Sequence, residues 1–225
     1  SFSARNNALE LEIKILEALH QKVIEISKDI IILSRKIASL DVYSTLGFIA
    51  EVYNWCHPQI DNSKDFIIKD GRHSVIEKTI FKKSLNAFVP NDCSLSTNEH
   101  LWLITGPNMA GKSTFLRQNA HIIMLAQIGS YVPAKQATIG IANKLFSRIG
   151  ASDNISKGQS TFMVEMLETS NIIKNADDKS FIILDEIGRG TSTFDGLAIA
   201  WAIIEKVLRS NKSRTWLATH YHELT

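Results

Sequence analysis

The sequence contains little cysteine, no long apolar run and almost no net charge, and each absence narrows the possible functions. Cys56 and Cys93 are the only cysteines, without a Cys-x-x-C or His/Cys cluster, which excludes a disulfide framework and gives no indication of a zinc site. We therefore expect a reducing, cytoplasmic location. No apolar stretch approaches the roughly 18 residues of a membrane helix, so we expect no membrane partner. The net charge of +2 gives no electrostatic case for a nucleic-acid surface, although it does not exclude one.

A phosphate-binding loop is the clearest motif that is present. Residues 106–114 match G-x-x-x-x-G-K-[ST] at every fixed position. The apolar residues 101–105 predict a strand before this loop, and a helix is expected after it, over residues 114–128. This context favours a nucleotide site over a turn that is merely rich in glycine. The residues predicted to bind ATP here are Gly106, Pro107, Asn108, Met109, Ala110, Gly111, Lys112, Ser113 and Thr114.

The chemistry of such a loop assigns different tasks to its members. Backbone N–H groups and the positive end of the following helix attract phosphate oxygens. Lys112 would reach the β and γ phosphates, and the Ser113 hydroxyl would bind Mg²⁺.

Two carboxylates form the chemical complement of this loop. Residues 181–184 predict a buried strand, and Asp185 and Glu186 stand at its carboxyl end. Asp185 can hold Mg²⁺, usually through water, and Glu186 can orient and polarise the water that attacks the γ-phosphorus. An adjacent pair of carboxylates is weak evidence alone, but the loop lysine favours the functional interpretation.

Two further residues have both a structural and a functional interpretation. Ser160 begins a predicted helix over 160–167, where it is either a cap or an anion site. His220 follows a predicted strand over 215–218, and a histidine at a strand end can contact the γ-phosphate and report its loss. The polar residues 188–196 predict a loop, followed by a helix over 197–208.

Glycine and proline are both missing from the first 46 residues. Two seven-residue ladders, offset by three, consist of Leu9, Leu16, Val23, Ile30 and Ile37, and of Leu19, Ile26, Leu33 and Leu40. They form an a/d seam, which predicts one long helix packed on another helix. This helix is either an ordinary core-facing element or a mechanical arm that carries motion to the ATP site. The polar break after Trp55 leads us to place a domain boundary between residues 60 and 61.

Four motifs together resemble the ATPase domain of the MutS family of DNA mismatch-repair proteins: GPNMAGKST at 106–114, STFMVEM at 160–166, DEIGRGTST at 185–193 and THYHEL at 219–224. The resemblance spans roughly residues 61–225. The family usually has Pro where Ser74 stands, and often Asp-Asp where Asp153-Asn154 stands. These departures concern loop rigidity and leave the catalytic positions unaffected.

The resemblance implies an α/β fold of the ABC-type P-loop class, with a mostly parallel sheet flanked by helices. It implies a Mg²⁺-dependent ATPase that works as a dimer of identical or related subunits, with each ATP between two subunits. By motif position, Phe88 would stack on adenine, Ser160 would approach the γ-phosphate of the opposite subunit's ATP, and His220 would sense the γ-phosphate. The catalytic residues would be Lys112, Glu186 and His220, and the Mg²⁺ ligands Ser113 and Asp185.

The resemblance also implies a larger protein, in which ATP turnover switches a dimeric DNA clamp during mismatch repair. Residues 1–60 would be the end of the family's lever, and residues 61–225 an ATPase domain truncated at its C-terminal end. The chain begins without Met and stops just after a motif, so we expect a fragment. Mismatched double-stranded DNA would bind through domains absent from this chain, and a MutL-like repair protein would be a partner.

Three alternatives remain beside this interpretation. The chain could be another ABC-type ATPase, of transporter or chromosome-structuring type, or a member of the recombination-suppressing MutS-like branch. The short stretch between Lys112 and Ser160 has no room for the long coiled coil that chromosome-structuring relatives insert there. A non-enzymatic scaffold conflicts with the fact that every catalytic position is filled.

Overall fold

The structure of the protein is a computed structural model that describes residues 2–82, 87–107, 109–149 and 161–224. The chain divides into two compact units, Ser1–Ile49 and Ala50–Thr225. The single long helix predicted at the start is instead two helices, α1 (Phe2–Glu25) and α2 (Ser27–Val52), interrupted at Ile26. Asp29 lies in the first turn of α2, where the positive helix end stabilises a carboxylate. Local charge thus supports a new helix start without glycine or proline.

The apolar ladders on α1 and α2 lie at the surface. The exposed fraction is 53% for Leu16, 48% for Ile30 and 69% for Leu40. A stripe of exposed apolar side chains of this length is unusual on a monomer. It agrees with the predicted packing on another helix, which stays a prediction.

The second unit contains two four-stranded sheets with helices between and around them. Its elements are β1 (Gln59–Asp61), β2 (Phe66–Gly71), α3 (Ser74–Lys82), β3 (Asn91–Leu95), β4 (Leu101–Ile104), α4 (Lys112–Gln127), β5 (Gln136–Gly140), β6 (Lys144–Arg148), α5 (Thr161–Asn175), β7 (Ser180–Asp185), α6 (Thr193–Lys206), the π-helical turn η2 (Val207–Asn211), β8 (Arg214–Ala218) and the 3₁₀ turn η3 (His222–Leu224). The alternation of strands and helices gives the predicted α/β class.

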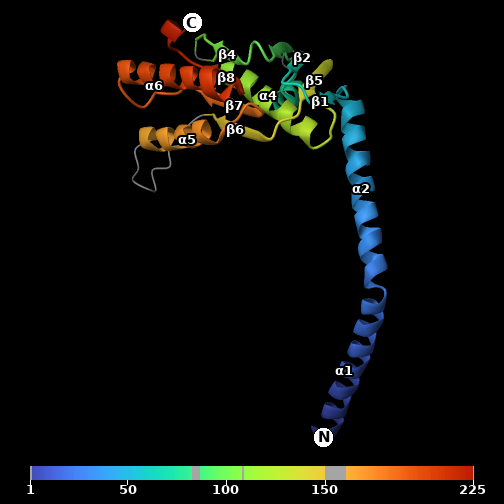
Figure 1. The fold of residues 1–225 in the computed structure, drawn as a ribbon. Coiled ribbons are helices and arrows are strands. Elements are labelled where there is room, and N and C mark those ends of the chain that lie inside the picture. The colour runs from blue at the N-terminus through green and yellow to red at the C-terminus, as the bar shows by residue number, and fades with distance from the viewer. Residues whose placement is uncertain (1, 83–86, 108, 150–160, 225) are drawn as a thin grey trace. The chain divides into compact units, whose positions relative to one another are not determined.

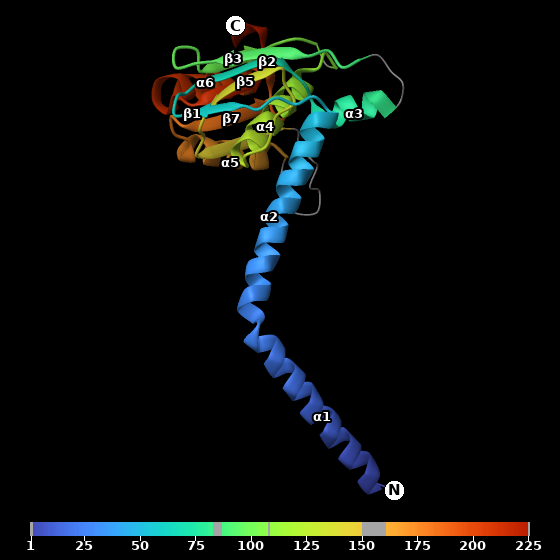
Figure 2. The same cartoon turned by 90° about the vertical axis from the view of Figure 1, so that its right-hand side faces the viewer.

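One sheet is entirely parallel and the other is mixed. The parallel sheet has the order β4-β8-β7-β6 (Figure 1), and the mixed sheet has the order β1-β5-β2-β3 (Figure 2). In the mixed sheet β1 and β5 are parallel, whereas β2 runs antiparallel to both of its neighbours. The expectation of a mostly parallel sheet therefore holds for one sheet only. The central strands β7 and β8 of the parallel sheet are almost fully buried, as strands with cover on both faces are, whereas β2, a central strand of the mixed sheet, contains an exposed position.

Two hydrophobic clusters cover opposite faces of the parallel sheet. Phe181 and Ile183 on β7 belong to the cluster that contains α4 and the mixed sheet. Ile182 and Leu184 belong to the cluster formed with α5 and α6. This alternation follows from the two-residue period of a strand. It buries β7 completely and leaves only its carboxyl end at the rim of the sheet.

Helix α6 begins earlier than predicted. Its first residue is Thr193, within the polar segment 188–196 that predicts a loop, and its last is Lys206. The Ser192 hydroxyl caps the helix by accepting a hydrogen bond of 3.3 Å from the Asp195 N–H. Ser followed by an acidic residue in the first turn is a helix-start pattern, and it outweighs the glycine content of this segment.

Candidate functional site

Three strand ends of the parallel sheet meet at its carboxyl edge. The central strand β8 pairs Ala218 with Ile104 on one side and with Asp185 on the other. Beyond the strands, the Thr219 N–H donates to the Ile104 carbonyl at 3.0 Å, and the Glu186 N–H donates to the Ala218 carbonyl at 2.9 Å. Parallel strands end at the same edge, which is where α/β sheets commonly place ligands. The phosphate-loop strand, the carboxylate pair and the Thr219 segment therefore share one edge.

The loop after β4 curls around the amino end of α4. Its backbone has a positive φ at Gly106 (145°), Met109 (66°) and Gly111 (92°). Glycine accepts this conformation without strain, which explains two of the fixed positions of the motif. Lys112 begins α4 and is 7% exposed, and its Nζ donates to the carbonyls of Gly106 at 2.6 Å and Pro107 at 2.9 Å.

The Lys112 ammonium has no carboxylate partner within the described residues. Burying a cation is costly unless a compensating charge or hydrogen bonds are present. Two carbonyls supply part of that compensation, and the start of α4 adds the positive end of a helix dipole. The local field therefore favours an anion at this point.

A cavity of about 310 Å³ lies between this loop and Glu186. The residues that line it are Met109, Gly111, Lys112, Ser113, Thr114 and Glu186. An ammonium, a hydroxyl and a carboxylate, contributed by α4 and by the end of β7, thus face one cavity. This is the arrangement that a phosphate-binding loop and a water-activating carboxylate require.

Glu186 adopts a strained backbone conformation. Its φ of 54° lies in the left-handed region, which is costly for a residue other than glycine and is concentrated at functional sites. Its side chain is 22% exposed and forms an ion pair of 2.5 Å between Oε2 and the Arg189 Nη1. Sequence reasoning missed this contact, although opposite charges three residues apart were a signal for it.

The side chain of Asp185 fits a role in cation binding. Its Oδ1 is buried and has no hydrogen-bond partner among the described residues. Carboxylate and hydroxyl oxygens, as in Asp185 and Ser113, are the ligands that Mg²⁺ prefers, and Mg²⁺ usually takes its remaining ligands from water and phosphate. No group of three or more His, Cys, Asp or Glu able to hold a metal occurs among the described residues, and such a magnesium site does not need one.

The other predicted residues have different placements. His220 is exposed, with its ring centroid 4.3 Å from that of Tyr221, and Phe88 is half-buried. Among the described residues, His220, Phe88 and Asp185 are not part of the cavity lining. Ala110 donates its N–H to the Pro107 carbonyl at 3.4 Å. Asn108 and Ser160 lie outside the described residues, and the roles assigned to all of these residues stay predictions.

A second set of contacts holds the segment after Glu186. The Gly188 N–H donates to Oε1 of Glu165 on α5 at 2.6 Å, and the Gly188 carbonyl accepts from the Tyr221 hydroxyl at 3.1 Å. Burial raises the pKa of Tyr221, and the nearby Glu165 and Glu223 carboxylates raise it further. Sequence reasoning missed Glu165 as well. The signal was an acidic residue at helical spacing from the buried Thr169 and Ile172, because a carboxylate on a buried face needs a donor.

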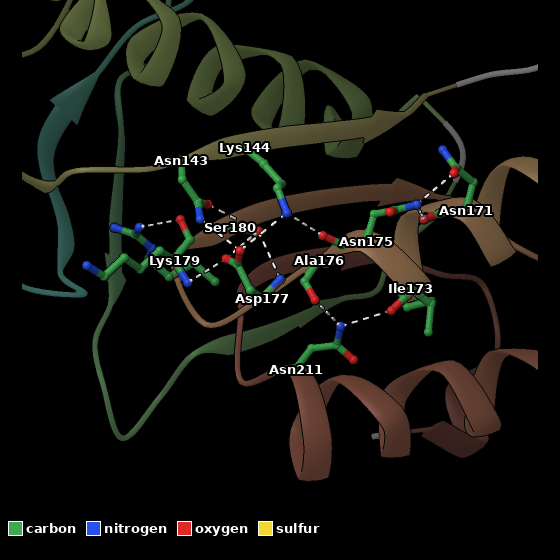
Figure 3. Close-up of polar contacts among 11 residues, drawn as sticks. Asn143, Lys144, Asn171, Ile173, Asn175, Ala176, Asp177, Lys179, Ser180 and Asn211 are labelled. Atoms are coloured by element: carbon green, nitrogen blue, oxygen red, sulfur yellow. Dashed lines mark hydrogen bonds and ion pairs between the residues drawn. The ribbon is translucent and has the colours of Figure 1, made fainter.

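A polar cluster lies near the start of β7, at the opposite end of this strand from the cavity (Figure 3). Asp177 is its centre. Its Oδ2 accepts from Asn143 at 2.8 Å, and its Oδ1 accepts from Ser180 at 2.8 Å and the Lys179 N–H at 3.0 Å. Partial burial opposes ionisation, but these bonds and Lys144 outweigh it and lower the pKa of Asp177 to about 2.

Comparison with known proteins agrees with the motifs at this edge. The sequence model of MutS domain V matches residues 102–225, which include the loop, the carboxylate pair and the His220 segment. The chain belongs to the MutS family. It is 52% identical over 225 residues to the DNA mismatch repair protein MutS of Ruegeria pomeroyi, covering 99% of this chain and 26% of that protein.

Two further MutS relatives show the same coverage. The DNA mismatch repair protein MutS of Ehrlichia chaffeensis is 54% identical over 223 residues, covering 99% of this chain and 27% of that protein. The protein of the same name from Bartonella tribocorum is 52% identical over 227 residues, covering 99% and 25%. The chain thus spans about a quarter of the length of these relatives. In the described part of the chain, no helix has both the length and the apolar character needed to cross a membrane.

Proposed function

We propose that this chain is the ATP-binding and ATP-hydrolysing part of a MutS protein that acts in DNA mismatch repair. Residues 61–225 would form the ATPase domain, of the ABC-type P-loop class, and residues 1–60 the end of a lever. The observation that carries the proposal is the single cavity lined by Lys112, Ser113 and Glu186. The family membership of residues 102–225 supports it.

Substrate binding begins with the loop and α4. The backbone N–H groups of the loop and the amino end of α4 attract the phosphates of ATP. The Lys112 ammonium, now held by two carbonyls of its own loop, would exchange them for β- and γ-phosphate oxygens, which are stronger acceptors because they are charged.

Hydrolysis requires a water molecule aimed at the γ-phosphorus. The Glu186 carboxylate would accept a hydrogen bond from this water, orient it and take up its proton as the bond to phosphorus forms. The Glu186 Oε2 is paired with the Arg189 guanidinium, which is 64% exposed, and the water would take the place of this guanidinium. Ser113 and Asp185 would hold Mg²⁺, which supplies neutralisation of the charge that develops on the phosphate oxygens.

Three residues would complete the site by motif position. Phe88 would stack on adenine, and His220 would sense the γ-phosphate. Ser160 would approach the γ-phosphate of an ATP bound by the opposite subunit of a homodimer or of a dimer with a related subunit. The same proposal includes Asn108 as a phosphate contact. These roles make the cycle of binding and hydrolysis dependent on association of two subunits.

The wider role is inferred from the relatives, which are DNA mismatch repair proteins. ATP turnover would switch a dimeric clamp on mismatched double-stranded DNA, which binds through domains outside this chain. A MutL-like repair protein would be a partner of the clamp. The protein would be located in the cytoplasm, in association with DNA. ATP hydrolysis would serve to switch the conformation of the clamp and not to modify a second substrate.

Binding of a fluorescent ATP analogue tests the proposal. Lys112→Ala is expected to weaken binding at least about 100-fold, because each charged phosphate contact contributes about 1.5–3 kcal/mol. Lys135→Ala is the matched control, since Lys135 has a side chain that is 74% exposed, and it should bind as the wild type does. Equal binding by Lys112→Ala and the wild type would contradict the proposal.

A further inference from the structure

Glu165 is a buried carboxylate for which the proposed chemistry has no use. It is 7% exposed and lies in the first turns of α5, whose first residue is Thr161. Its Oε1 accepts a hydrogen bond of 2.6 Å from the Gly188 N–H, which lies in the segment after β7. A charge-assisted bond of this length is strong when it is buried. The contact therefore ties α5 to the segment that follows the carboxylate pair.

Hydrogen bonds hold both of the peptide units that flank the Gly188 Cα. Glu165 accepts from the Gly188 N–H, and the Tyr221 hydroxyl donates to the Gly188 carbonyl at 3.1 Å. Gly188 has a φ of 85°, and a Cβ at this position would come within 2.7 Å of the Gly196 Cα. The two peptide units on either side of Gly188 thus have little freedom to rotate while both bonds are in place.

This constraint lies two residues from Glu186. On the other side, the Glu186 N–H is fixed by the Ala218 carbonyl at 2.9 Å. Between the two anchors, Ile187 is 1% exposed and belongs to the hydrophobic cluster that α5 and α6 share. The strained backbone of Glu186, with its φ of 54°, is therefore set by anchors on β8 and on α5.

A second contact joins the start of α5 to the same segment. A Cβ at Gly190 would lie 3.0 Å from the Phe162 Cβ, so the backbone at Gly190 packs directly on the first turn of α5. Phe162 and Glu165 are three residues apart and share one helix face. A displacement of the amino end of α5 would therefore move the 188–190 segment with it.

We propose that Glu165 is a positioning residue of the ATPase site, which holds the Gly188 peptide and thereby orients the Glu186 carboxylate toward the cavity. This inference rests on the proposed function. It also gives α5 a way to influence Glu186. Residue 160, the predicted contact to the opposite subunit's ATP, directly precedes this helix in sequence. A shift of α5 on subunit association would reach Glu186 of the same chain through Glu165.

Steady-state ATP hydrolysis and binding of a fluorescent ATP analogue, measured on the intact protein, test the proposal. Glu165→Ala is expected to lower kcat about 10- to 100-fold, the size of effect that a displaced catalytic group produces, while the Kd for the analogue stays within about threefold. Glu165→Gln keeps an oxygen acceptor for the Gly188 N–H and should recover most of kcat. A loss of binding in parallel with kcat would indicate a merely structural role and overturn the proposal.

Glu205→Gln is the matched control, because the Glu205 carboxylate on α6 pairs with the exposed Arg209 on η2 and the variant should keep the wild-type kcat. If Glu165→Ala does not fold, Tyr221→Phe tests the proposal instead. It removes the hydrogen bond to the Gly188 carbonyl and should lower kcat without changing Kd. Wild-type kcat in Tyr221→Phe or in Glu165→Ala would overturn the inference alone. Failure of the wild type to bind the analogue would overturn the proposed function.

Discussion

At the scale of single residues, Glu186 shows how a local conformation can serve chemistry. It follows a fully buried strand, has a positive φ and faces the cavity that contains Lys112. A strained residue persists only where its surroundings fix it, and here the surroundings are β8, α5 and Arg189. The cost in backbone energy is balanced by placement of a carboxylate opposite the phosphate loop.

Glu186→Gln separates binding from hydrolysis. The amide keeps the size of the side chain but cannot take a proton from water, so the rate of ATP hydrolysis should fall at least about 100-fold. Binding of a fluorescent ATP analogue should be unchanged, because Glu186 does not supply a positive charge to the phosphates. Phosphate release and analogue titration measure the two quantities. A variant that keeps most of its turnover would leave Glu186 with a structural role only.

The lowered pKa of Asp177 predicts that the stability of the folded chain depends on pH. This pKa is about 2 in the folded chain, below the ordinary 3.8, so the folded state binds fewer protons than the unfolded state across this range. The stabilisation is present above about pH 4 and is lost as the pH falls towards 2. Because the carboxylate is 39% exposed, solvent screening limits it to about 1 kcal/mol.

Asp177→Asn measures this contribution. Its free energy of unfolding should lie about 1 kcal/mol below that of the wild type at pH 7, because the amide cannot accept as strongly from Asn143 and Lys144. The difference should shrink at each lower pH and approach zero near pH 2. Urea titrations at several pH values provide the comparison. A difference that is constant with pH would show that charge at Asp177 is not the cause.

At the scale of elements, local patterns predicted most of the strands and helices that carry the site. The loop at Lys112 and the strand before Asp185 follow from short-range signals, namely a fixed glycine spacing and a continuous apolar run. The convergence of their ends follows from parallel pairing. The interruption at Ile26 and the early start of α6 at Thr193 were not predicted, because helix boundaries depend on capping details that apolar periodicity does not contain.

Contacts between distant elements were beyond sequence reasoning. Glu165 and Gly188, which are hydrogen-bonded, are 23 positions apart in the sequence, and the mixed sheet joins β5 to the much earlier β2. No local pattern specifies such partners, since burial and hydrogen bonding decide them only once the chain has folded. The sequence motifs therefore predicted the residues with chemical roles, whereas the residues that hold those side chains in place were identified only from the structure.

Two helical glycines provide a test of packing between elements. Gly196 lies in the first turn of α6, and a Cβ there would overlap the Tyr221 hydroxyl and the Gly188 carbonyl oxygen. Gly196→Ala should therefore lower the free energy of unfolding by about 2–3 kcal/mol, as overpacking does. Urea denaturation measures the change, and wild-type stability in this variant would contradict the packing described.

Gly47 is the matched control within α2. A Cβ at Gly47 meets no atom within 4 Å, and alanine is a better helix former than glycine. Gly47→Ala should leave stability unchanged or raise it by up to about 1 kcal/mol. The same substitution is thus expected to have opposite effects at two helical glycines, because only one of them lies against another backbone.

At the scale of the whole second unit, Arg214 joins the two sheets. It is 1% exposed, and its guanidinium donates to the Gly140 carbonyl at the end of β5 and to the Lys179 carbonyl before β7, at 2.7 and 3.2 Å. Its Cζ lies 3.8 Å from the centroid of the Phe181 ring. Burial lowers the pKa of Arg214 to about 10, so the group stays protonated at neutral pH.

Arg214→Met should cost about 2–3 kcal/mol of unfolding free energy, the scale of losing charge-assisted hydrogen bonds to buried acceptors. Methionine retains the length and apolar volume of the stem, so the loss reports on the bonds more than on packing. Guanidinium denaturation followed by tryptophan fluorescence and by circular dichroism measures it. Unchanged stability would mean that the carbonyls find other donors.

The contacts of Arg214 with both sheets have a consequence for local unfolding of the second unit. Because the Arg214 side chain anchors β8 to the end of β5 in the mixed sheet, we expect local unfolding of one sheet to disrupt the strand pairing of the other. Amide protons of β5 and β8 should then exchange with deuterium through one shared opening event. A nucleotide that tightens the rim beyond β8 would slow exchange in strands it never touches.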